Sequence, residues 1–393
     1  MDLSYSAGEE EFRAEARAWL RAHVPAEPLP SLETAEGFAA HRAWEAELAA
    51  GGWSVVSWPE RYGGRDADLT RWLLFEEEYY AAGAPGRVSQ NGVSLLAPTL
   101  FAYGTEEQRA RVLPSMATGG TIWAQAWSEP EAGSDLASLT SRAVRTDGGW
   151  LLSGQKTWSS RAAFADRAFG IFRSDPGPAA EGRPHRGLTY LMFDLRAPGV
   201  TVRPIGRLDG RPAFAELFLD EVFVPDEDVV GDPGQGWRIA MSATGNERGL
   251  TLRSPGRFLA AADRLVRLWR ERSGESEGAE GLVGAGAGLG DRVADAVIGA
   301  RAYQLFTVAG AARLAEGGDL GAESSLNKVF WSGLDLALHE TALDLLGEEG
   351  EWADSPWAEG YVFALAGPIY AGTNEIQRDI IAERLLGLPK GRR

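Results

Sequence analysis

Hydrophobic residues recur at helical spacing over the first 120 residues of the chain. Ser6 and Glu9 have the spacing of a capping box, in which the serine accepts from a backbone N–H and the glutamate reaches back. Pro25 ends the first run, and a second signal of the same kind begins at Thr105. The pattern predicts an N-terminal helical domain over residues 1–120, with its apolar stripes in the core.

The hydrophobic period changes between residues 121 and 235. Asp147-Gly148-Gly149 separates two β-rich runs and predicts a hairpin turn. Three further short β-rich segments are bounded by Gly, Pro or Asp; they cover residues 187–195, 200–205 and 213–223. We expect a central antiparallel β-barrel or sandwich over residues 121–235.

The helical period returns after Gly236, with long amphipathic segments at 291–316 and 322–346. The glycine-rich stretch 273–290 predicts a flexible loop. We therefore expect a C-terminal four-helix bundle over residues 236–393. Helices, then strands, then helices indicate an α+β multidomain protein rather than a doubly wound sheet. A nucleotide or flavin would have to bind in a cleft between domains.

Composition limits the function classes. The chain of 393 residues has a formal charge of −17, which disfavours nucleic acid and anionic membranes as partners. It has no cysteine, which excludes disulfides and thiolate metal sites, and its four histidines lack metal-ligand spacing. No signal peptide or membrane-spanning run is visible, so the sequence predicts a cytoplasmic protein without a metal.

Candidate chemistry begins in the middle of the chain. Ser128 and Ser160 offer hydroxyl groups, and Gly133 allows a ligand to approach the backbone closely. Trp158 supplies a flat apolar wall suited to a planar ring. Taken alone, these residues are more typical of a strand, a turn and a structural aromatic than of a ligand site.

Three motifs together carry a family resemblance. They are Trp123–Asp135 with Gly154–Ser160, Thr244–Gly249, and the tail Gly367–Arg378. In order and spacing they resemble the acyl-CoA dehydrogenases, flavoenzymes that desaturate acyl thioesters. The resemblance implies an N-terminal helical domain, a β-domain and a helical bundle around non-covalent FAD. It implies α,β-dehydrogenation of an acyl thioester, with an acyl-CoA as the expected substrate.

The resemblance also implies site residues. The expected FAD-binding residues are Gln125, Trp127, Ser128, Trp158, Ser160, Thr373 and Glu375. The expected substrate-binding residues are Ser134, Arg248, Ala371 and Gly372. The backbone N–H of Ala371 can polarise the thioester carbonyl, because that donor does not depend on the side chain.

The catalytic base requires a carboxylate that can reach the α-carbon. Many family members carry it where this chain has Ala371, but in the long-chain and isovaleryl branches it directly precedes the arginine that matches Arg248. A Glu-Arg pair on a helix is by itself typical of a surface. The resemblance implies that Glu247 takes the α-proton, while the β-hydrogen leaves as hydride to flavin N5.

One segment departs from the family. Most members carry Arg-x-x-Phe-Gly to reach a neighbour's FAD, whereas Arg272 is followed by no phenylalanine. We expect a homodimer or homotetramer with an electron-transfer flavoprotein as acceptor, and a heteromer is the alternative. Two other functions stay open: a non-catalytic subunit of a heteromer, and an oxygen-using oxidase or monooxygenase. Flavin uptake by the chain alone and oxygen consumption would discriminate them.

Overall fold

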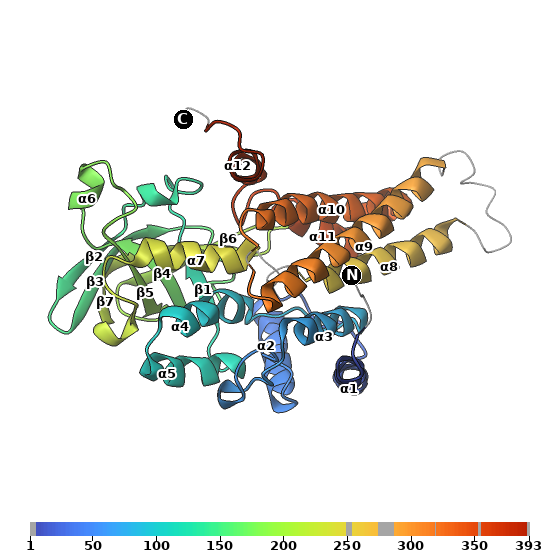
Figure 1. The fold of residues 1–393 in the computed structure, drawn as a ribbon, viewed down its shortest axis with the longest axis horizontal. Coiled ribbons are helices and arrows are strands. Elements are labelled where there is room, and N and C mark those ends of the chain that lie inside the picture. The colour runs from blue at the N-terminus through green and yellow to red at the C-terminus, as the bar shows by residue number, and fades with distance from the viewer. Residues whose placement is uncertain (1–4, 249–253, 274–286, 319, 353–354, 391–393) are drawn as a thin grey trace. The chain divides into compact units, whose positions relative to one another are not determined.

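The computed structural model describes residues 5–248, 254–273, 287–318, 320–352 and 355–390 (Figure 1). The chain divides into two compact units, each built from stretches that are separated in the sequence. The helical unit comprises Met1–Val24, Ala67–Ala84 and Arg248–Arg393, and the sheet unit comprises Pro25–Asp66 and Pro85–Glu247. The helices near the N-terminus are therefore shared between the two units.

The sheet unit contains five helices and eight strands among the described residues. Its helices are α2 (Ala35–Ala50), α4 (Ala97–Tyr103), α5 (Glu106–Ala117), α6 (Gly177–Ala180) and α7 (Gly236–Arg248), the last residue of α7 belonging to the helical unit. Its strands are β1 (Trp123–Ala126), β2 (Arg142–Thr146), β3 (Gly149–Lys156), β4 (Arg167–Arg173), β5 (Leu188–Asp194), β6 (Val200–Ile205), β7 (Phe214–Pro225) and β8 (Val229–Val230).

The strands of the described chain form one sheet in the order β6-β7-β3-β2-β4-β5-β8, with β1 beside β4. The predicted hairpin is confirmed, because Thr146 pairs with Gly149 across the turn. The sheet is sandwich-like and is not a closed barrel. It is also not purely antiparallel, because β1 pairs with β4 in parallel. Alternating hydrophobicity reports which residues share a face but not the direction of neighbouring strands, so the sequence could not show this.

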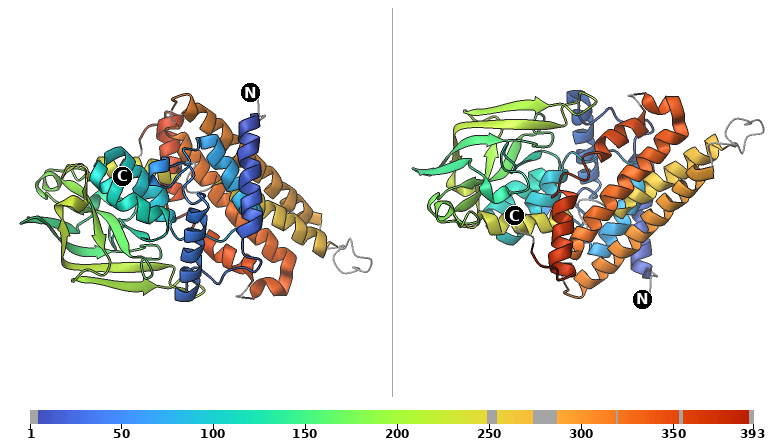
Figure 2. Two further views of the ribbon diagram at one scale, coloured as in Figure 1. Left: turned by 90° about the horizontal axis from the view of Figure 1, so that it is seen from below. Right: turned by 90° about the horizontal axis from the view of Figure 1, so that it is seen from above.

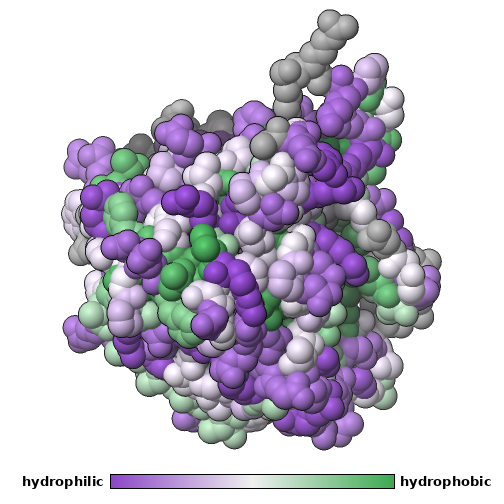
Figure 3. All heavy atoms as spheres, turned by 90° about the vertical axis from the view of Figure 1, so that its left-hand side faces the viewer, coloured by the Kyte–Doolittle hydropathy of each residue, from purple (hydrophilic) through white to green (hydrophobic). Residues whose placement is uncertain are grey.

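At β4 both faces of the sheet are buried. Along β4, Phe169 and Ile171 enter a core shared with residues of α4, α5 and α7, whereas Ala168 and Phe172 enter a second core on the opposite face. This alternation follows from the two-residue period of a strand. Figure 3 shows a face of the molecule that is mostly hydrophilic, with small hydrophobic areas. Strands β1 and β3 contribute residues to these cores, so the segments that leave the two strands are anchored in the sheet unit.

The helical unit contains seven helices among the described residues. They are α1 (Ala7–His23), α3 (Leu69–Ala81), α8 (Pro255–Arg272), α9 (Ala287–Ala315), α10 (Glu323–Leu346), α11 (Pro356–Ala364) and α12 (Asn374–Ile380). The predicted capping box is confirmed, since Ser6 and Glu9 bond reciprocally at the start of α1. Helices α8, α9 and α10 run side by side around one core that includes Phe258, Ala300 and Trp331 (Figure 2).

One boundary in this unit differs from the prediction. The sequence predicts a loop over 273–290, but α9 begins at Ala287. Leu289 packs against the core of the unit, and this packing outweighs the low helix propensity of the flanking glycines. Residues 274–286 of the predicted loop lie outside the described residues. No helix in the described part of the chain is long and apolar enough to cross a membrane.

Candidate active site

Two segments of the sheet unit carry most of the predicted flavin-binding residues. The first leaves β1, where Gln125 and Ser128 are half-buried. The second leaves β3. The backbone N–H of Thr157 donates to the carbonyl oxygen of Ser128 at 2.9 Å, so the structure brings the two segments together. The half-buried Ser160 follows on the second segment.

Trp158 has the most unusual conformation of these residues. Its φ of 59° lies in the left-handed region, which costs a non-glycine residue of order 1 kcal/mol or more. Its side chain is 60% exposed, and its ring meets the ring of Phe214 edge-on at 5.9 Å between centroids. Strain of this kind persists where the surrounding structure enforces it, often at a binding site. An exposed flat ring held beside Ser128 and Ser160 fits the isoalloxazine of FAD.

Trp127 lies on the first segment, directly after β1. Its ring is buried in the first core of the sheet unit, 6.4 Å from the ring of Tyr190. Its indole Nε1 is buried and has no hydrogen-bond partner among the described residues. Its carbonyl oxygen accepts from Lys156 Nζ at 3.2 Å. Trp127 therefore anchors its segment to the core, and its indole N–H is a donor available to a ligand that reaches the core.

A buried ion pair joins the two segments, and the sequence reading missed it. Glu129 directly follows Ser128, and Lys156 lies two residues before Trp158. Lys156 Nζ is 2.8 Å from Glu129 Oε1, and both side chains are buried. Lys156 and hydrogen bonds from Thr140 and Ser141 outweigh the effect of burial and lower the pKa of Glu129 to about 2. Complete burial lowers the pKa of Lys156 to about 8, against the attraction of Glu129. The sequence signal for this pair is an acidic residue beside Ser128 in one motif and a basic residue close to Trp158 in the other.

The predicted thioester serine lies in the loop between these segments. Ser134 is exposed, and a Cβ added to Gly133 would meet nothing within 4 Å. This open space fits close approach of a ligand to the backbone, which is the role that the glycine suggests. The loop returns to the sheet through the short turn η3 (Leu136–Ser138) and enters β2.

The helical unit holds the predicted tail residues in one turn. Ala371 and Gly372 both have left-handed backbones, with φ of 55° and 76°. The buried Gln377 donates from Nε2 to the carbonyl oxygen of Ala371 at 2.9 Å. Thr373 caps helix α12 by accepting from the N–H of Ile376. The structure therefore gathers Ala371, Gly372 and Thr373 at the start of one short helix.

Side chains below this turn form a buried polar network. Lys328 Nζ of α10 donates to Asn374 Oδ1 at 2.8 Å, and the amide and hydroxyl groups of Asn374 and Ser332 bond at 3.1 and 3.2 Å. Glu375 points out of the network and is exposed. Its own backbone N–H and the hydroxyl of Thr373 lower the pKa of this carboxyl. The exposed Glu375 carboxylate can accept from a ribose hydroxyl, and the hydroxyl of the half-buried Thr373 can donate to a ribose or phosphate oxygen.

The predicted base and its neighbour lie at the end of α7. Glu247 is the last residue of the sheet unit, and Arg248 is the first residue of this part of the helical unit. Their side chains lie outside the described part of the structure. No carboxylate occupies the tail position of Ala371. The described residues hold no group of three or more histidine, aspartate or glutamate side chains suited to a metal ion.

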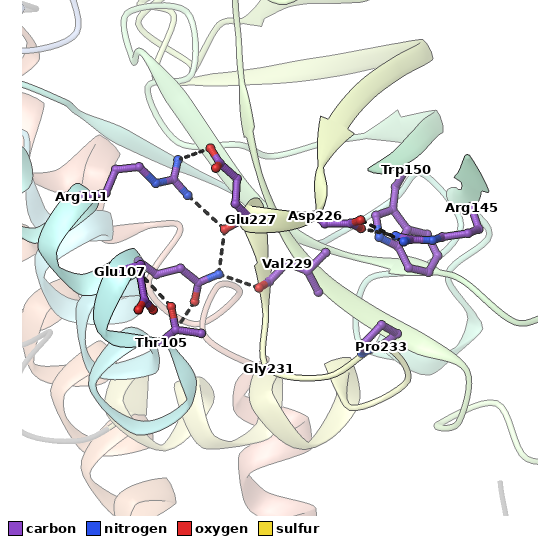
Figure 4. Close-up of a pocket in the computed structure, with 11 residues that line it drawn as sticks. Thr105, Glu107, Arg111, Arg145, Trp150, Asp226, Glu227, Val229, Gly231 and Pro233 are labelled. Carbon is purple, nitrogen blue, oxygen red and sulfur yellow. Dashed lines mark hydrogen bonds and ion pairs between the residues drawn. The ribbon is translucent and has the colours of Figure 1, made fainter. Parts of the chain in front are cut away.

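A pocket lies elsewhere in the sheet unit, between α5, the β2–β3 hairpin and the segment around η4 (Asp226–Asp228) (Figure 4). Its volume is about 700 Å³. Its cations are already paired: Arg145 lies against Asp226, and Arg111 lies 3.5 Å from Glu227. None of its described lining residues belongs to the predicted flavin or thioester set. The predicted residues lie instead on the two segments of the sheet unit and, separately, on the tail turn of the helical unit.

Comparison with family models gives three matches that together span most of the chain. The N-terminal domain of acyl-CoA dehydrogenases matches residues 6–120, their middle domain matches 124–222, and their C-terminal domain matches 234–386. The flavin-compatible segments lie in the middle match, and the tail turn lies in the C-terminal match.

Individual relatives agree along their full length. Acyl-CoA dehydrogenase IpdE1 of Mycobacterium tuberculosis is 38% identical, over 97% of this chain and 98% of that protein. The ChsE4–ChsE5 complex of the same organism contains a chain that is 29% identical with a TM-score of 0.82, and the match covers 100% of each chain. The Tcur3481-Tcur3483 steroid ACAD is 26% identical with a TM-score of 0.82 and the same coverage.

Proposed function

Because this chain belongs to the acyl-CoA dehydrogenase family and is an FAD-dependent oxidoreductase of acyl-CoA thioesters, we propose that Glu247 is its catalytic base. The observation that carries the proposal is the exchange between two positions: the tail turn presents Ala371, and a glutamate stands directly before Arg248. The α-proton is acidic only beside a polarised thioester, so its removal needs a positioned carboxylate.

The division of labour among the residues follows from their chemistry. Glu247 takes the α-proton, and the N–H of Ala371 donates to the thioester oxygen as negative charge develops there. FAD, when bound, supplies the oxidant that takes up the β-hydrogen with two electrons. Gln125, Ser128, Trp158 and Ser160 hold the isoalloxazine, with Trp127 behind them. Thr373 and Glu375 bind the adenosine half, and Ser134, Arg248 and Gly372 hold the thioester.

The substrate we propose is a CoA thioester with a steroid-derived acyl group. Support comes from the Tcur3481-Tcur3483 steroid ACAD, which matches this chain over its full length at 26% identity. The test is an anaerobic titration of the oxidised flavin with steroid-derived, straight-chain and branched acyl-CoA thioesters. Bleaching at 450 nm by the steroid-derived thioester is the expected outcome. Bleaching by short straight-chain thioesters alone would reject the steroid assignment.

The acceptor we propose is an electron-transfer flavoprotein, the partner that the family resemblance implies. Oxygen is the competing acceptor. Turnover that depends on an added electron-transfer flavoprotein supports the proposal. Thioester-dependent oxygen uptake at a similar rate would instead identify an oxidase.

The assembly we propose is a heteromer with a second, related chain. The solved ChsE4–ChsE5 complex is a two-protein assembly, and its matching chain is 29% identical to this one. This chain also lacks the Arg-x-x-Phe-Gly segment; the described Arg272 is held by Glu349 instead. Exposed apolar side chains on α9 and α10 offer a surface for association; they are Val297, Ile298, Leu305, Phe306, Leu326 and Phe330. A homo-oligomer that binds FAD without a second chain would overturn this proposal.

A further inference from the structure

The ammonium of Lys156 is completely buried and fully bonded. It donates to Glu129 Oε1 at 2.8 Å, to the carbonyl oxygen of Ile171 at 2.9 Å and to that of Trp127 at 3.2 Å. Three acceptors match the three hydrogens of an ammonium group. An ion pair in this position contributes little net stability compared with apolar residues of the same size. The role of the ion pair therefore lies in the groups that it holds together and not in the stability that it adds.

The carboxylate of Glu129 closes the loop that carries the thioester serine. Its Oε2 accepts from the backbone N–H of Thr140 at 2.7 Å and from the Thr140 hydroxyl at 3.0 Å. Its Oε1 accepts from the N–H of Ser141 at 2.9 Å. Glu129 stands at the start of the loop and these donors at its end. One side chain thus ties both ends of the segment that presents Gly133 and Ser134.

A second buried cation supports the same loop. Arg173 of β4 donates to the carbonyl oxygens of Ala137 at 2.8 Å and Leu139 at 3.4 Å, and its backbone N–H donates to that of Ser141 at 2.8 Å. The return half of the loop is therefore held from the sheet. The half around Ser134 is exposed and depends on its ends for its position.

The pair is also adjacent to both flavin-compatible segments. Lys156 holds the carbonyl of Trp127, next to Ser128, and is itself followed by Thr157 and Trp158. The N–H of Thr157 donates to Ser128, which completes the connection between the segments. The two charges therefore lie where the loop that carries Ser134 meets the segments that carry Ser128 and Trp158.

We infer that Glu129 and Lys156 are positioning residues. They hold the loop that carries Ser134 at a fixed position relative to Ser128 and Trp158. The inference rests on the proposed assignment of Ser128 and Trp158 to the flavin and of Ser134 to the thioester. A displacement of about 1 Å between reacting groups can reduce turnover by roughly a hundredfold. Loss of the pair should therefore weaken FAD and thioester binding beyond any effect on folding.

The variants separate positioning from stability. Glu129→Gln or Lys156→Met alone leaves a buried charge without its counter-ion, and either one can prevent folding. The double variant E129Q/K156M removes both charges. Asp228→Asn is the matched control, because Asp228 is a buried carboxylate of the same unit that pairs with Arg111 at 2.7 Å and Arg167 at 2.6 Å. Thr140→Val removes only one hydroxyl donor to Glu129 and tests the loop in a variant whose backbone bonds remain.

Each variant is prepared in the assembly in which the wild-type chain binds FAD. The measurements are the thermal midpoint, the FAD Kd from flavin fluorescence, KM and kcat with the best thioester, and hydrogen exchange of the peptide spanning 129–141. For E129Q/K156M we expect a thermal midpoint near that of Asp228→Asn. We expect FAD Kd and KM at least about tenfold above wild type, and faster exchange at Thr140 and Ser141. Thr140→Val should raise KM by about two- to threefold and leave FAD Kd unchanged.

Wild-type FAD Kd, KM and exchange in E129Q/K156M would overturn the inference. If E129Q/K156M does not fold, an unchanged KM in Thr140→Val overturns it, and a raised KM with unchanged FAD Kd supports it. Ser128→Ala and Trp158→Ala are measured alongside. Unchanged FAD binding in these two variants would reject the proposed flavin assignment. Loss of FAD in them, with the double variant like wild type, would reject only the positioning role.

Discussion

Gln377 donates its side-chain amide to the carbonyl oxygen of Ala371, 2.9 Å away, and thereby holds a left-handed alanine at the position where many relatives carry their base. Gln377 is fully buried, so the bond is shielded from water. The residue at the centre of this turn has no reactive side chain, so it offers only its backbone groups to a ligand.

Replacing Gln377 with leucine should preserve volume but remove the donor to Ala371. A buried acceptor left without its partner costs about 1–3 kcal/mol, so the free energy of unfolding should fall by that amount. Urea unfolding of the apo-protein measures it. The exposed Arg378→Gln in the same helix is the control and should change stability by less than about 0.5 kcal/mol. A Gln377→Leu variant as stable as wild type would show that the bond does not hold the turn.

Glu247→Gln should abolish proton abstraction while FAD remains bound. Removal of a general base costs about 10²–10⁴ in rate, which anaerobic stopped-flow reduction of the flavin would measure. Glu227→Gln, an exposed carboxylate of the sheet unit, is the control. Flavin reduction at the wild-type rate in Glu247→Gln would exclude Glu247 as the base.

A second-site variant sharpens the same test. Ala371→Glu added to Glu247→Gln places a carboxylate at the tail position, where the left-handed backbone already accepts a side chain. We expect partial recovery of flavin reduction, at least about tenfold above Glu247→Gln alone. Absence of recovery, with FAD still bound, would mean that the two positions do not approach the same α-carbon in this chain.

Acid should lower the free energy of unfolding, because it protonates Glu129. Its folded pKa of about 2 lies below the ordinary value of 4.5, so its stabilising contribution is present above pH 4.5 and is lost as the pH falls towards 2. The contribution is on the order of 3 kcal/mol. Lys156 acts in the opposite sense at high pH: its pKa is lowered from 10.5 to about 8, so it favours stability as the pH rises between these values. Urea unfolding at a series of pH values should show both slopes flattened in E129Q/K156M.

FAD should be bound without a covalent bond. The chain has no cysteine, and its four histidines, at positions 23, 41, 185 and 339, lie outside the flavin motifs. Acid precipitation of the yellow holoprotein should leave a colourless pellet and all of the flavin in the supernatant. A pellet that keeps its flavin absorbance after washing would disprove this.

Charge on α9 should disrupt assembly. Ile298 and Leu305 are 65% and 45% exposed and lie seven residues apart on one face of the helix. Ile298→Glu should lower the mass measured by light scattering without lowering the thermal midpoint of the chain. Val144→Glu, an exposed apolar residue of the sheet unit, is the control. An unchanged mass for Ile298→Glu would place the association surface elsewhere.

Much of the fold follows from local pattern. The capping residues Ser6 and Thr105 and the turn at Gly148 act through neighbouring atoms, so their sequence alone predicts the structure they form. The parallel pairing of β1 with β4 could not be predicted, because it depends on which distant strand lies beside β1. The start of α9 was misplaced for a related reason: Leu289 gains its stability from the core of its unit.

The sequence likewise predicted some features of the candidate site and not others. Ser128, Trp158 and Ala371 were identified by motif. The exposure of Trp158 and its left-handed backbone, together with the Glu129–Lys156 pair, needed three-dimensional information. The side chains of Glu247 and Arg248 lie outside the described residues, so their role stays a prediction from sequence.

The helical unit is assembled from three separated stretches of chain: Met1–Val24, Ala67–Ala84 and Arg248–Arg393. During synthesis, α1 and α3 leave the ribosome long before α8 and α9, the helices against which α3 packs. The sheet unit is complete once Glu247 has been made, so it can fold before α8 and α9 have been synthesised. The order of translation therefore leaves the face of α3 that packs on α8 and α9 uncovered until those helices are made, and a nascent chain halted before Arg248 would offer that face to chaperones.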